Sequence, residues 1–252
     1  MKTKFTLLLC IFVLLFACDK SDNNDRIAEA IAHPERSDED RKRDITSKPA
    51  AVLKLLDLQP GDKVADLFAG RGYYSELIAH IVGGEGEVLA HTVKAYKRFI
   101  GDALEERIGD RLPQVKILAQ EPNEIDLGTQ TLDAAIMVMA YHDMYFSNEE
   151  IGWAPIDVPA FMTKLYAALK PGGKLLIVDH AAKDGSGNSE ARSLHRIEES
   201  FALEDIESYG FIQTGTSDAL RNHEDDRSKN VFDDSIRHNT DRFVLLFVKP
   251  EK

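Results

Sequence analysis

The segment DKVADLFAGRGYYSELIAH, residues 62–80, constrains the fold more than any other part of the 252-residue chain. Its first half, KVADLF, predicts a short buried strand, and YYSELIAHIV predicts a helix that ends at the next glycine pair. Between them, Gly70 and Gly72 let the backbone turn tightly and approach a ligand. This order is typical of an open α/β sheet, in which ligands bind beyond the carboxyl ends of the strands.

Strand-like and helix-like segments alternate through the rest of the chain. Apolar runs predict further strands at 86–92, 114–120, 132–140, 173–180, 211–217 and 241–250, and helices at 49–58, 94–109, 159–170 and 200–210. Such alternation predicts a parallel sheet covered on both faces, and the last two strands, with no helix between them, predict an antiparallel edge. We expect one domain over residues 27–252, with a helical extension at 27–47.

Residues 218–240 are polar and show no clear period. Loops of that length are usually either functional lids or disordered segments, and both interpretations stay open.

The chain begins like a protein that leaves the cytoplasm. Residues 1–17 combine a basic start with an apolar run that is too short to span a bilayer, as in a signal peptide. The sequence LFAC resembles a bacterial lipoprotein box, which implies lipidation at Cys18, although Phe16 stands where a small residue is usual. An uncleaved anchor helix is the alternative. We expect a polar tether at 18–26 and a soluble domain held at the cell envelope, in the periplasm or at the cell surface.

Charge and cysteine content narrow the partners. Without Lys2 and Lys4, 29 basic residues stand against 43 acidic ones, a net charge of −14. An acidic surface disfavours nucleic acid and anionic lipid, so we expect contact with the membrane only through the anchor. Cys10 lies in the signal segment and Cys18 would be acylated, which leaves no thiol or disulfide in the domain.

The G-x-G pattern alone does not identify the ligand. A dinucleotide turn has a third glycine where Ser75 stands, and an acidic residue about 20 residues further on that binds the ribose. Asp66, at the strand end, can orient the turn or accept N–H bonds from a ligand. A plain strand-to-helix turn without a ligand stays open.

Three segments together resemble the class I S-adenosylmethionine-dependent methyltransferases: LQPGDKVADLFAGRG, LDAAIMVMAYHD and LKPGGKLLIVDH. The chain looks closest to a subgroup of predicted methyltransferases with signal peptides that share GYYSE, DH, HRI and TDRFVL segments. The resemblance implies a Rossmann-like seven-stranded sheet in the order 3-2-1-4-5-7-6 and S-adenosyl-L-methionine as cofactor. It implies a cofactor site at Asp66, Phe68, Ala69, Gly70, Gly72, Tyr73, Tyr74, Thr92, Glu121 and Tyr141.

Two positions depart from the family pattern. Phe68 stands at the first glycine of D-x-G-x-G-x-G, and Thr92 stands where most members have an acid that holds the ribose hydroxyls. A hydroxyl cannot accept as a carboxylate does, which removes charge-assisted bonds of about 1.5–3 kcal/mol each. Cofactor binding is then weak, or the nucleoside differs. Glu121 is either a replacement or a plain surface charge.

Polar residues follow the fourth and fifth predicted strands, which are neighbours in this fold. They are His142 and Asp143, then Asp179 and His180, with His195 shortly after. A histidine with a near-neutral pKa there would act as a general base when the acceptor must lose a proton. A metal site is a second interpretation, but no H-x-H or H-E-x-x-H spacing supports it, and we expect no metal. The third interpretation is structural: these histidine and aspartate side chains cap helices and bridge loops.

The leading hypothesis is a methyltransferase anchored to the cell envelope, with an unknown small-molecule or envelope substrate. A nicotinamide-dependent oxidoreductase fits poorly, because the third glycine and the ribose acid are both missing. A lipoprotein that binds a nucleoside or another small ligand without catalysis is the alternative from another class, since fold does not imply function.

Overall fold

The computed structural model describes residues 22–251. The expected signal peptide and the lipidation site Cys18 lie outside these residues. Among the described residues, no helix has the length and apolar character needed to cross a bilayer.

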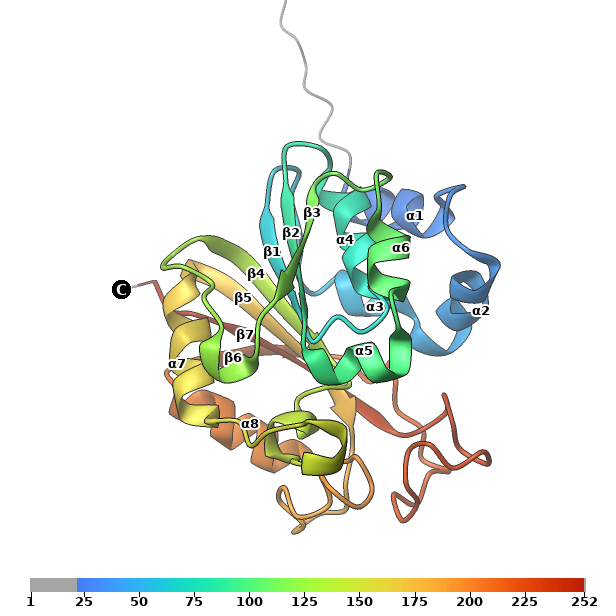
Figure 1. Cartoon of the computed structure of the whole chain (residues 1–252), viewed down its shortest axis with the longest axis vertical. Helices are drawn as coiled ribbons and strands as arrows, with labels where there is room; N and C mark the ends of the chain where they lie inside the picture. Colours follow the sequence, from blue (N-terminus) through green and yellow to red (C-terminus); the bar gives the residue numbers. More distant parts are fainter. Residues whose placement is uncertain (1–21, 252) are drawn as a thin grey trace, which may run out of the picture.

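Seven strands form one sheet in the order β3-β2-β1-β4-β5-β7-β6, which confirms the predicted fold class (Figure 1). The strand β7 is antiparallel to both neighbours, β5 and β6, while β1 to β5 run parallel. The strands are β1 Lys63–Leu67, β2 Glu87–Thr92, β3 Val115–Ala119, β4 Leu132–Val138, β5 Leu169–His180, β6 Ile212–Thr216 and β7 Arg242–Val248.

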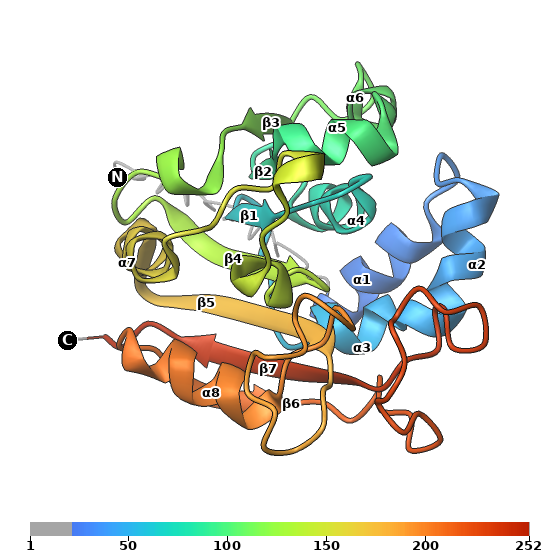
Figure 2. The ribbon, with the colours of Figure 1, turned by 60° about the horizontal axis from the view of Figure 1, so that its bottom comes forward.

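Helices cover both faces of this sheet. Figure 2 shows α1 to α4 on one side and α7 and α8 on the other. The α-helices are α1 Asn23–Ala32, α2 Asp38–Ser47, α3 Pro49–Leu53, α4 Tyr73–Val82, α5 Lys94–Ile100, α6 Ala103–Ile108, α7 Val158–Ala168 and α8 Glu199–Ser208. Three short 3₁₀ helices lie in the loops: η1 Pro122–Glu124, η2 His142–Tyr145 and η3 Glu149–Ile151.

The central strands are buried on both faces, which explains why they read as continuous apolar runs. In β4, Ala135 and Met137 face the core under α7 and α8, whereas Ala134 and Ile136 face the core under α1, α3, α4 and α6. Because side chains alternate along a strand, one apolar run supplies both cores.

Ion pairs attach the N-terminal helices next to the β1 turn. Arg107 of α6 lies 2.5 Å from both Asp40 of α2 and Glu76 of α4, and all three side chains are largely buried. The carboxylate of Asp44 in α2 also accepts a bond from Tyr73. Residues 23–47 are therefore part of the folded body.

Three expected boundaries were wrong. The single helix predicted at 94–109 is two helices, because Gly101 has a φ of 59° and ends α5, which leaves Phe99 62% exposed. The helix predicted at 49–58 ends at Leu53. The described end of the expected tether, from Asn23, is the first turn of α1.

The polar segment 218–240 has its own anchor in the protein. Arg196, 0% exposed, pairs with Asp225 of this segment at 2.9 Å and also bonds the carbonyls of Ala181 and Lys229. Leu220 and Val231 are buried under the same segment. These contacts explain how a polar segment without periodicity has a defined course.

Replacing Arg196 by Met should lower the free energy of unfolding by about 3–5 kcal/mol, because the buried Asp225 carboxylate loses its countercharge. Lys97→Met is the control, since its ion pairs with Asp102 and Glu105 are open to solvent and should contribute little to stability. Urea denaturation of both variants measures the difference. Equal effects would show that the buried pair does not hold the 218–240 segment in place.

Candidate functional site

The turn between β1 and α4 has the backbone that the sequence predicts. Gly70 and Gly72 have φ of 56° and 77°, values that favour glycine. A side chain added at Gly70 would meet no atom within 4 Å, whereas one at Gly72 would come within 2.7 Å of Leu104. Gly72 therefore allows α4 and α6 to pack, and Gly70 faces open space that a ligand can fill.

Phe68 keeps the glycine-like backbone of the position it occupies, with a φ of 54°. Its side chain is 4% exposed and lies among Tyr96, Trp153 and Phe161, with ring centroids 5.9 to 6.5 Å away. Aromatic packing of this kind offsets the cost of left-handed backbone for a bulky residue. Phe68 thus has a buried ring in an aromatic cluster, and its contact with a cofactor stays a prediction.

His91 holds this turn, and the sequence analysis missed it. Its Nδ1 accepts the N–H of Phe68 at 3.3 Å, its Nε2–H donates to the carbonyl of Gln120, and its own carbonyl accepts the N–H of Ala69. Burial lowers the pKa of His91 to about 4, so the ring is neutral. In the sequence it looks like any residue of a strand, and only the pairing of β1, β2 and β3 explains its role.

Asp66 is buried at the end of β1, where its Oδ2 accepts the hydroxyl of Ser75 at 2.6 Å. Burial raises the pKa of Asp66 from 3.8 to about 6, and the bonds from Ser75 oppose that shift. A carboxylate with an elevated pKa at a ligand-binding turn is a functional candidate.

Tyr73 and Tyr74 begin α4, and the N-terminal helices engage Tyr73. The Tyr73 hydroxyl donates to Asp44 at 2.6 Å, and the guanidinium of Arg43 lies 4.0 Å from its ring centroid. Tyr74 is buried edge-on against Tyr73, and burial raises its pKa to about 12. The structure thus places the Tyr73 side chain in contact with α2.

Thr92 ends β2 with its side chain buried. Glu121 follows β3, and its carboxylate accepts the N–H of Lys94 at 3.1 Å. Glu121 therefore reaches the segment that directly follows Thr92, next to the place where the family resemblance expects a ribose-binding acid.

The structure brings together the five polar residues that follow β4 and β5, and we call this cluster the rim. The rim residues are His142, Asp143, Asp179, His180 and His195. Asp179 accepts the ring Nδ1–H of His142 at 2.8 Å and the backbone N–H groups of His142 and His180, both at 2.7 Å. The other nitrogen of His142, Nε2, lies 3.2 Å from Asp143. His195, on the loop after β5, has its Nδ1 3.8 Å from the same carboxylate.

The pKa of His142 differs from the near-neutral value expected from the sequence. Burial alone would lower the pKa of His142, but Asp179 and Asp143 outweigh it and raise the pKa to about 10. His142 is thus protonated at neutral pH, a state that does not suit a general base, and its catalytic role stays a prediction. His180, whose Nδ1 lies 2.7 Å from the Thr240 hydroxyl, has a pKa well below its ordinary value because of burial and the nearby positive His142.

Tyr141 lies on the α8 side of the rim. Its side chain is fully buried, and its hydroxyl donates to Asp205 of α8, which also accepts the Tyr145 hydroxyl at 2.5 Å. Its side chain is therefore committed to α8, and its contact with a cofactor stays a prediction.

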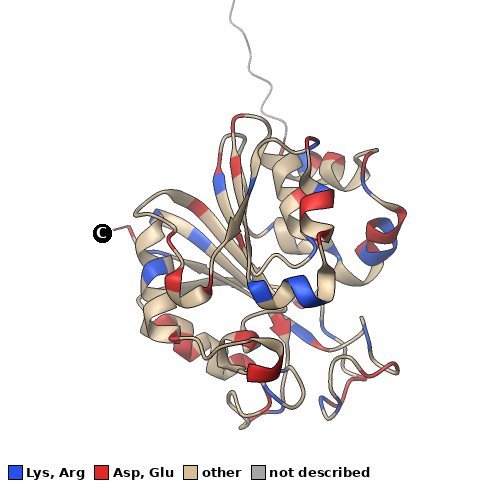
Figure 3. Cartoon of the chain, in the orientation of Figure 1, with Lys and Arg blue, Asp and Glu red and all other residues tan. Residues whose placement is uncertain are grey.

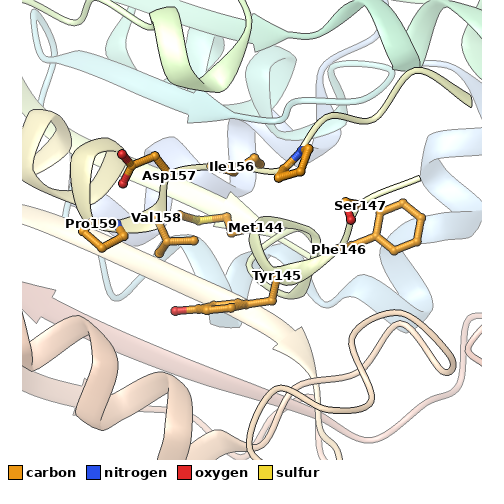
Figure 4. Close-up of a pocket in the computed structure, with 9 residues that line it drawn as sticks. Met144, Tyr145, Phe146, Ser147, Ile156, Asp157, Val158 and Pro159 are labelled. Carbon is orange, nitrogen blue, oxygen red and sulfur yellow. The ribbon is translucent and has the colours of Figure 1, made fainter. Parts of the chain in front are cut away.

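An open pocket of about 460 Å³ is lined by the residues that follow His142 and Asp143 in the sequence and by the start of α7 (Figure 4). The segment after His142 and Asp143 forms one wall, and the start of α7 with the residues before it forms the other. The lining residues are mainly apolar: Met144, Tyr145, Phe146, Ser147, Pro155, Ile156, Asp157, Val158 and Pro159.

Proteins of similar sequence are methyltransferases. The chain is 27% identical over 205 residues to a phosphoethanolamine N-methyltransferase of Triticum aestivum, which covers 77% of this chain and 36% of that protein. It is 24% identical over 174 residues to a demethylmenaquinone methyltransferase of Listeria monocytogenes, which covers 66% of each. The chain spans between about a third and half of the length of the first curated relatives it matches. No protein-family model matches it.

Solved methyltransferase structures have the same fold. A phosphoethanolamine N-methyltransferase 2 of Haemonchus contortus in complex with S-adenosyl-L-methionine aligns with a TM-score of 0.57 at 18% identity, over 81% of this chain and 53% of that one. At this identity the likeness establishes the fold.

Asp66→Asn should stabilise the protein above about pH 6. Between pH 3.8 and about 6, the unfolded chain has lost the Asp66 proton and the folded chain keeps it, so stability falls as pH rises. Above that window the penalty is complete, on the order of 3 kcal/mol. Thermal unfolding should show parent and variant alike at pH 3.5 and the variant more stable at pH 7.5.

The companion variant Ser75→Ala should do the reverse at pH 7.5, because the carboxylate then loses its hydroxyl donor. If Asp66→Asn destabilises the protein equally at both pH values, the carboxyl group has no elevated pKa in the folded state.

Proposed function

We propose that this chain is an S-adenosylmethionine-dependent methyltransferase that acts on a small-molecule or envelope substrate. The observation that carries the proposal is the position of the β1 turn. Strand order reverses between β1 and β4, the point at which open α/β sheets bind ligands. The turn with its open space at Gly70 follows β1, and the polar rim begins directly after β4.

The residues present fit the cofactor. Gly70 leaves space for close backbone approach, Asp66 offers a carboxylate, and Thr92 and Glu121 offer oxygens where β2 and β3 end. S-adenosylmethionine, when bound, supplies a methyl group on a sulfonium for in-line displacement by a nucleophile. Positioning is then the main task of the protein.

The rim contributes charge and a proton acceptor. His142 carries its proton between two carboxylates. His180 is neutral and is a weak base, because burial lowers its pKa, and it is the imidazole left to take a proton from a nucleophile that must lose one. The pocket beside the rim supports an acceptor with an apolar part, because its walls are mostly Met, Phe, Pro, Ile and Val side chains.

One observation favours the non-catalytic alternative, a nucleoside- or small-ligand-binding protein. Thr92 is buried and uncharged at the position where the family resemblance expects the ribose-binding acid. Turnover separates the two proposals: slow hydrolysis of bound S-adenosylmethionine supports the enzyme, and binding without any turnover supports the alternative.

The partners and location are part of the proposal. We infer that the domain is tethered to the cell envelope through Cys18 and meets the membrane only there. Figure 3 shows acidic and basic residues interspersed over the described helices and loops, an arrangement that supports a small-molecule substrate over nucleic acid.

Gly70→Val should abolish binding of S-adenosylhomocysteine, measured by calorimetry on the full-length chain, because a side chain would fill the open space at the turn. Gly83→Val is the matched control: Gly83 also has positive φ and open space, but it ends α4 at the opposite end of that helix. Both variants should lose about 1–2 kcal/mol of stability from left-handed strain. Binding that survives in Gly70→Val would place the cofactor elsewhere.

Cys18→Ala should leave an unprocessed precursor and abolish fatty-acid labelling in bacterial cells, because the cysteine thiol is the acylation site in the proposed lipoprotein. Cys10→Ala is the control and should be processed and labelled like the parent. Normal labelling of Cys18→Ala would exclude the lipid anchor.

A further inference from the structure

We propose that His142, Asp143 and His195 form a binding site for one divalent transition-metal ion. These three residues offer one ligand atom each, and the three atoms lie within 4.8 Å of one another. The proposal does not depend on methyl transfer, because it concerns only the binding of an ion, which can be measured without a methyl donor.

The spacing suits a single ion. Donors at about 2.0–2.2 Å from a metal lie roughly 3.0–3.5 Å apart. Nε2 of His142 is 3.2 Å from Oδ1 of Asp143, and Nδ1 of His195 is 3.8 Å from the same oxygen. The rings of the two histidines are nearly perpendicular, at 89°, with centroids 5.4 Å apart. Small movements of the side chains would bring all three donors to one ion.

Asp179 provides the supporting shell that metal-bound histidines usually have. It is fully buried and accepts the Nδ1–H of His142, which leaves Nε2 directed toward Asp143 and His195. It also accepts the backbone N–H of His142, so ring and backbone are both fixed. A carboxylate behind an imidazole in this way orients the ring and makes its free nitrogen a better ligand.

His195 is held at the rim by its neighbours. Arg196, the next residue, is locked in the interior by Asp225 and by the carbonyls of Ala181 and Lys229. His195 itself adopts a φ of 53°, an uncommon backbone for a histidine, and its ring packs against Phe146 and Phe232. Strained backbone that the surroundings enforce is typical of functional sites.

Charge balance supports a divalent ion. Asp143 and Asp179 place two carboxylates within 3.2 Å of the nitrogens of one imidazole. A divalent ion with neutral histidines neutralises both. Two imidazole nitrogens and one carboxylate oxygen suit zinc, iron(II), manganese or cobalt better than magnesium or calcium, which prefer oxygen ligands.

Three protein ligands leave at least one coordination position for water or for an oxygen of the acceptor. Tyr96 of α5 hydrogen-bonds to Asp143, and the apolar pocket begins at Met144, so the site lies between the helix that follows β2 and the proposed acceptor pocket. An ion there would lower the pKa of a hydroxyl of the methyl acceptor that binds to it.

The test is direct metal binding by the purified full-length chain, without any methyl donor. After chelator treatment, the protein is titrated with zinc, and with cobalt(II) as a spectroscopic probe. We expect one tightly bound equivalent per chain, a visible cobalt spectrum and a higher melting temperature with zinc. His195→Ala and Asp143→Asn should weaken binding at least about 100-fold.

Control variants separate this site from adventitious binding. His223→Ala, an exposed histidine away from the cluster, should bind like the parent, and Cys10 and Cys18 are unchanged in all variants. The proposal is overturned if the parent binds no stoichiometric ion, or if folded His195→Ala and Asp143→Asn bind as the parent does. Should either variant fail to fold by circular dichroism, the cobalt spectrum of the parent decides, because it reports nitrogen and oxygen ligands directly. S-adenosylhomocysteine calorimetry on the same samples tests the methyltransferase proposal separately.

Discussion

The carboxylate of Asp179 joins the ends of the two central strands, and the arrangement of the rim depends on it. From the end of β5 it accepts N–H groups from His142, which follows β4, and from His180 beside it. An uncompensated carboxylate in this position would be very costly, so the imidazole of His142 and these N–H groups are a condition for its burial. Because the backbone N–H of His142 is bound to Asp179, the chain leaves β4 in a fixed direction. This direction also sets the position of the pocket wall that begins at Met144.

The architecture follows from patterns that act locally in sequence. Doubly buried strands read as apolar runs and glycine turns separate them from helices, so a parallel sheet with an antiparallel edge could be predicted from the pattern. The strand order itself came from the family resemblance. The proximity of the rim residues could also be predicted, because the carboxyl ends of neighbouring parallel strands lie at the same edge of the sheet. What could not be predicted rests on contacts between distant segments. His91 acts through its bond to Phe68, and the ring of Phe68 acts through Trp153 and Phe161.

The same limit applies to the ligand triad and to the pKa of His142. A short metal motif carries its ligands within a few residues, but His142 and Asp143 meet His195 only because β5 and its loop return to the end of β4. The sequence shows two His-Asp pairs, yet it does not show that Asp179 and Asp143 flank one ring from both sides. The prediction of a single helix across Gly101 failed for another reason. An apolar stripe of helical spacing can continue across two separate helices, so it does not reveal the break between α5 and α6.

Several local rules of folding are broken at one end of the sheet. Positive φ at Asp57 and Gln130 is ordinary, because these are exposed polar residues outside helices and strands. Positive φ at Phe68, Met139 and His195 is different, since these residues follow β1, β4 and β5 and are too bulky to favour it. Buried Asp66 and Asp179 and half-buried Asp143 lie at or just after these same strand ends. A protein under selection for stability alone would relax such positions, so their concentration where the strand order reverses indicates that this end of the sheet is the one that function maintains.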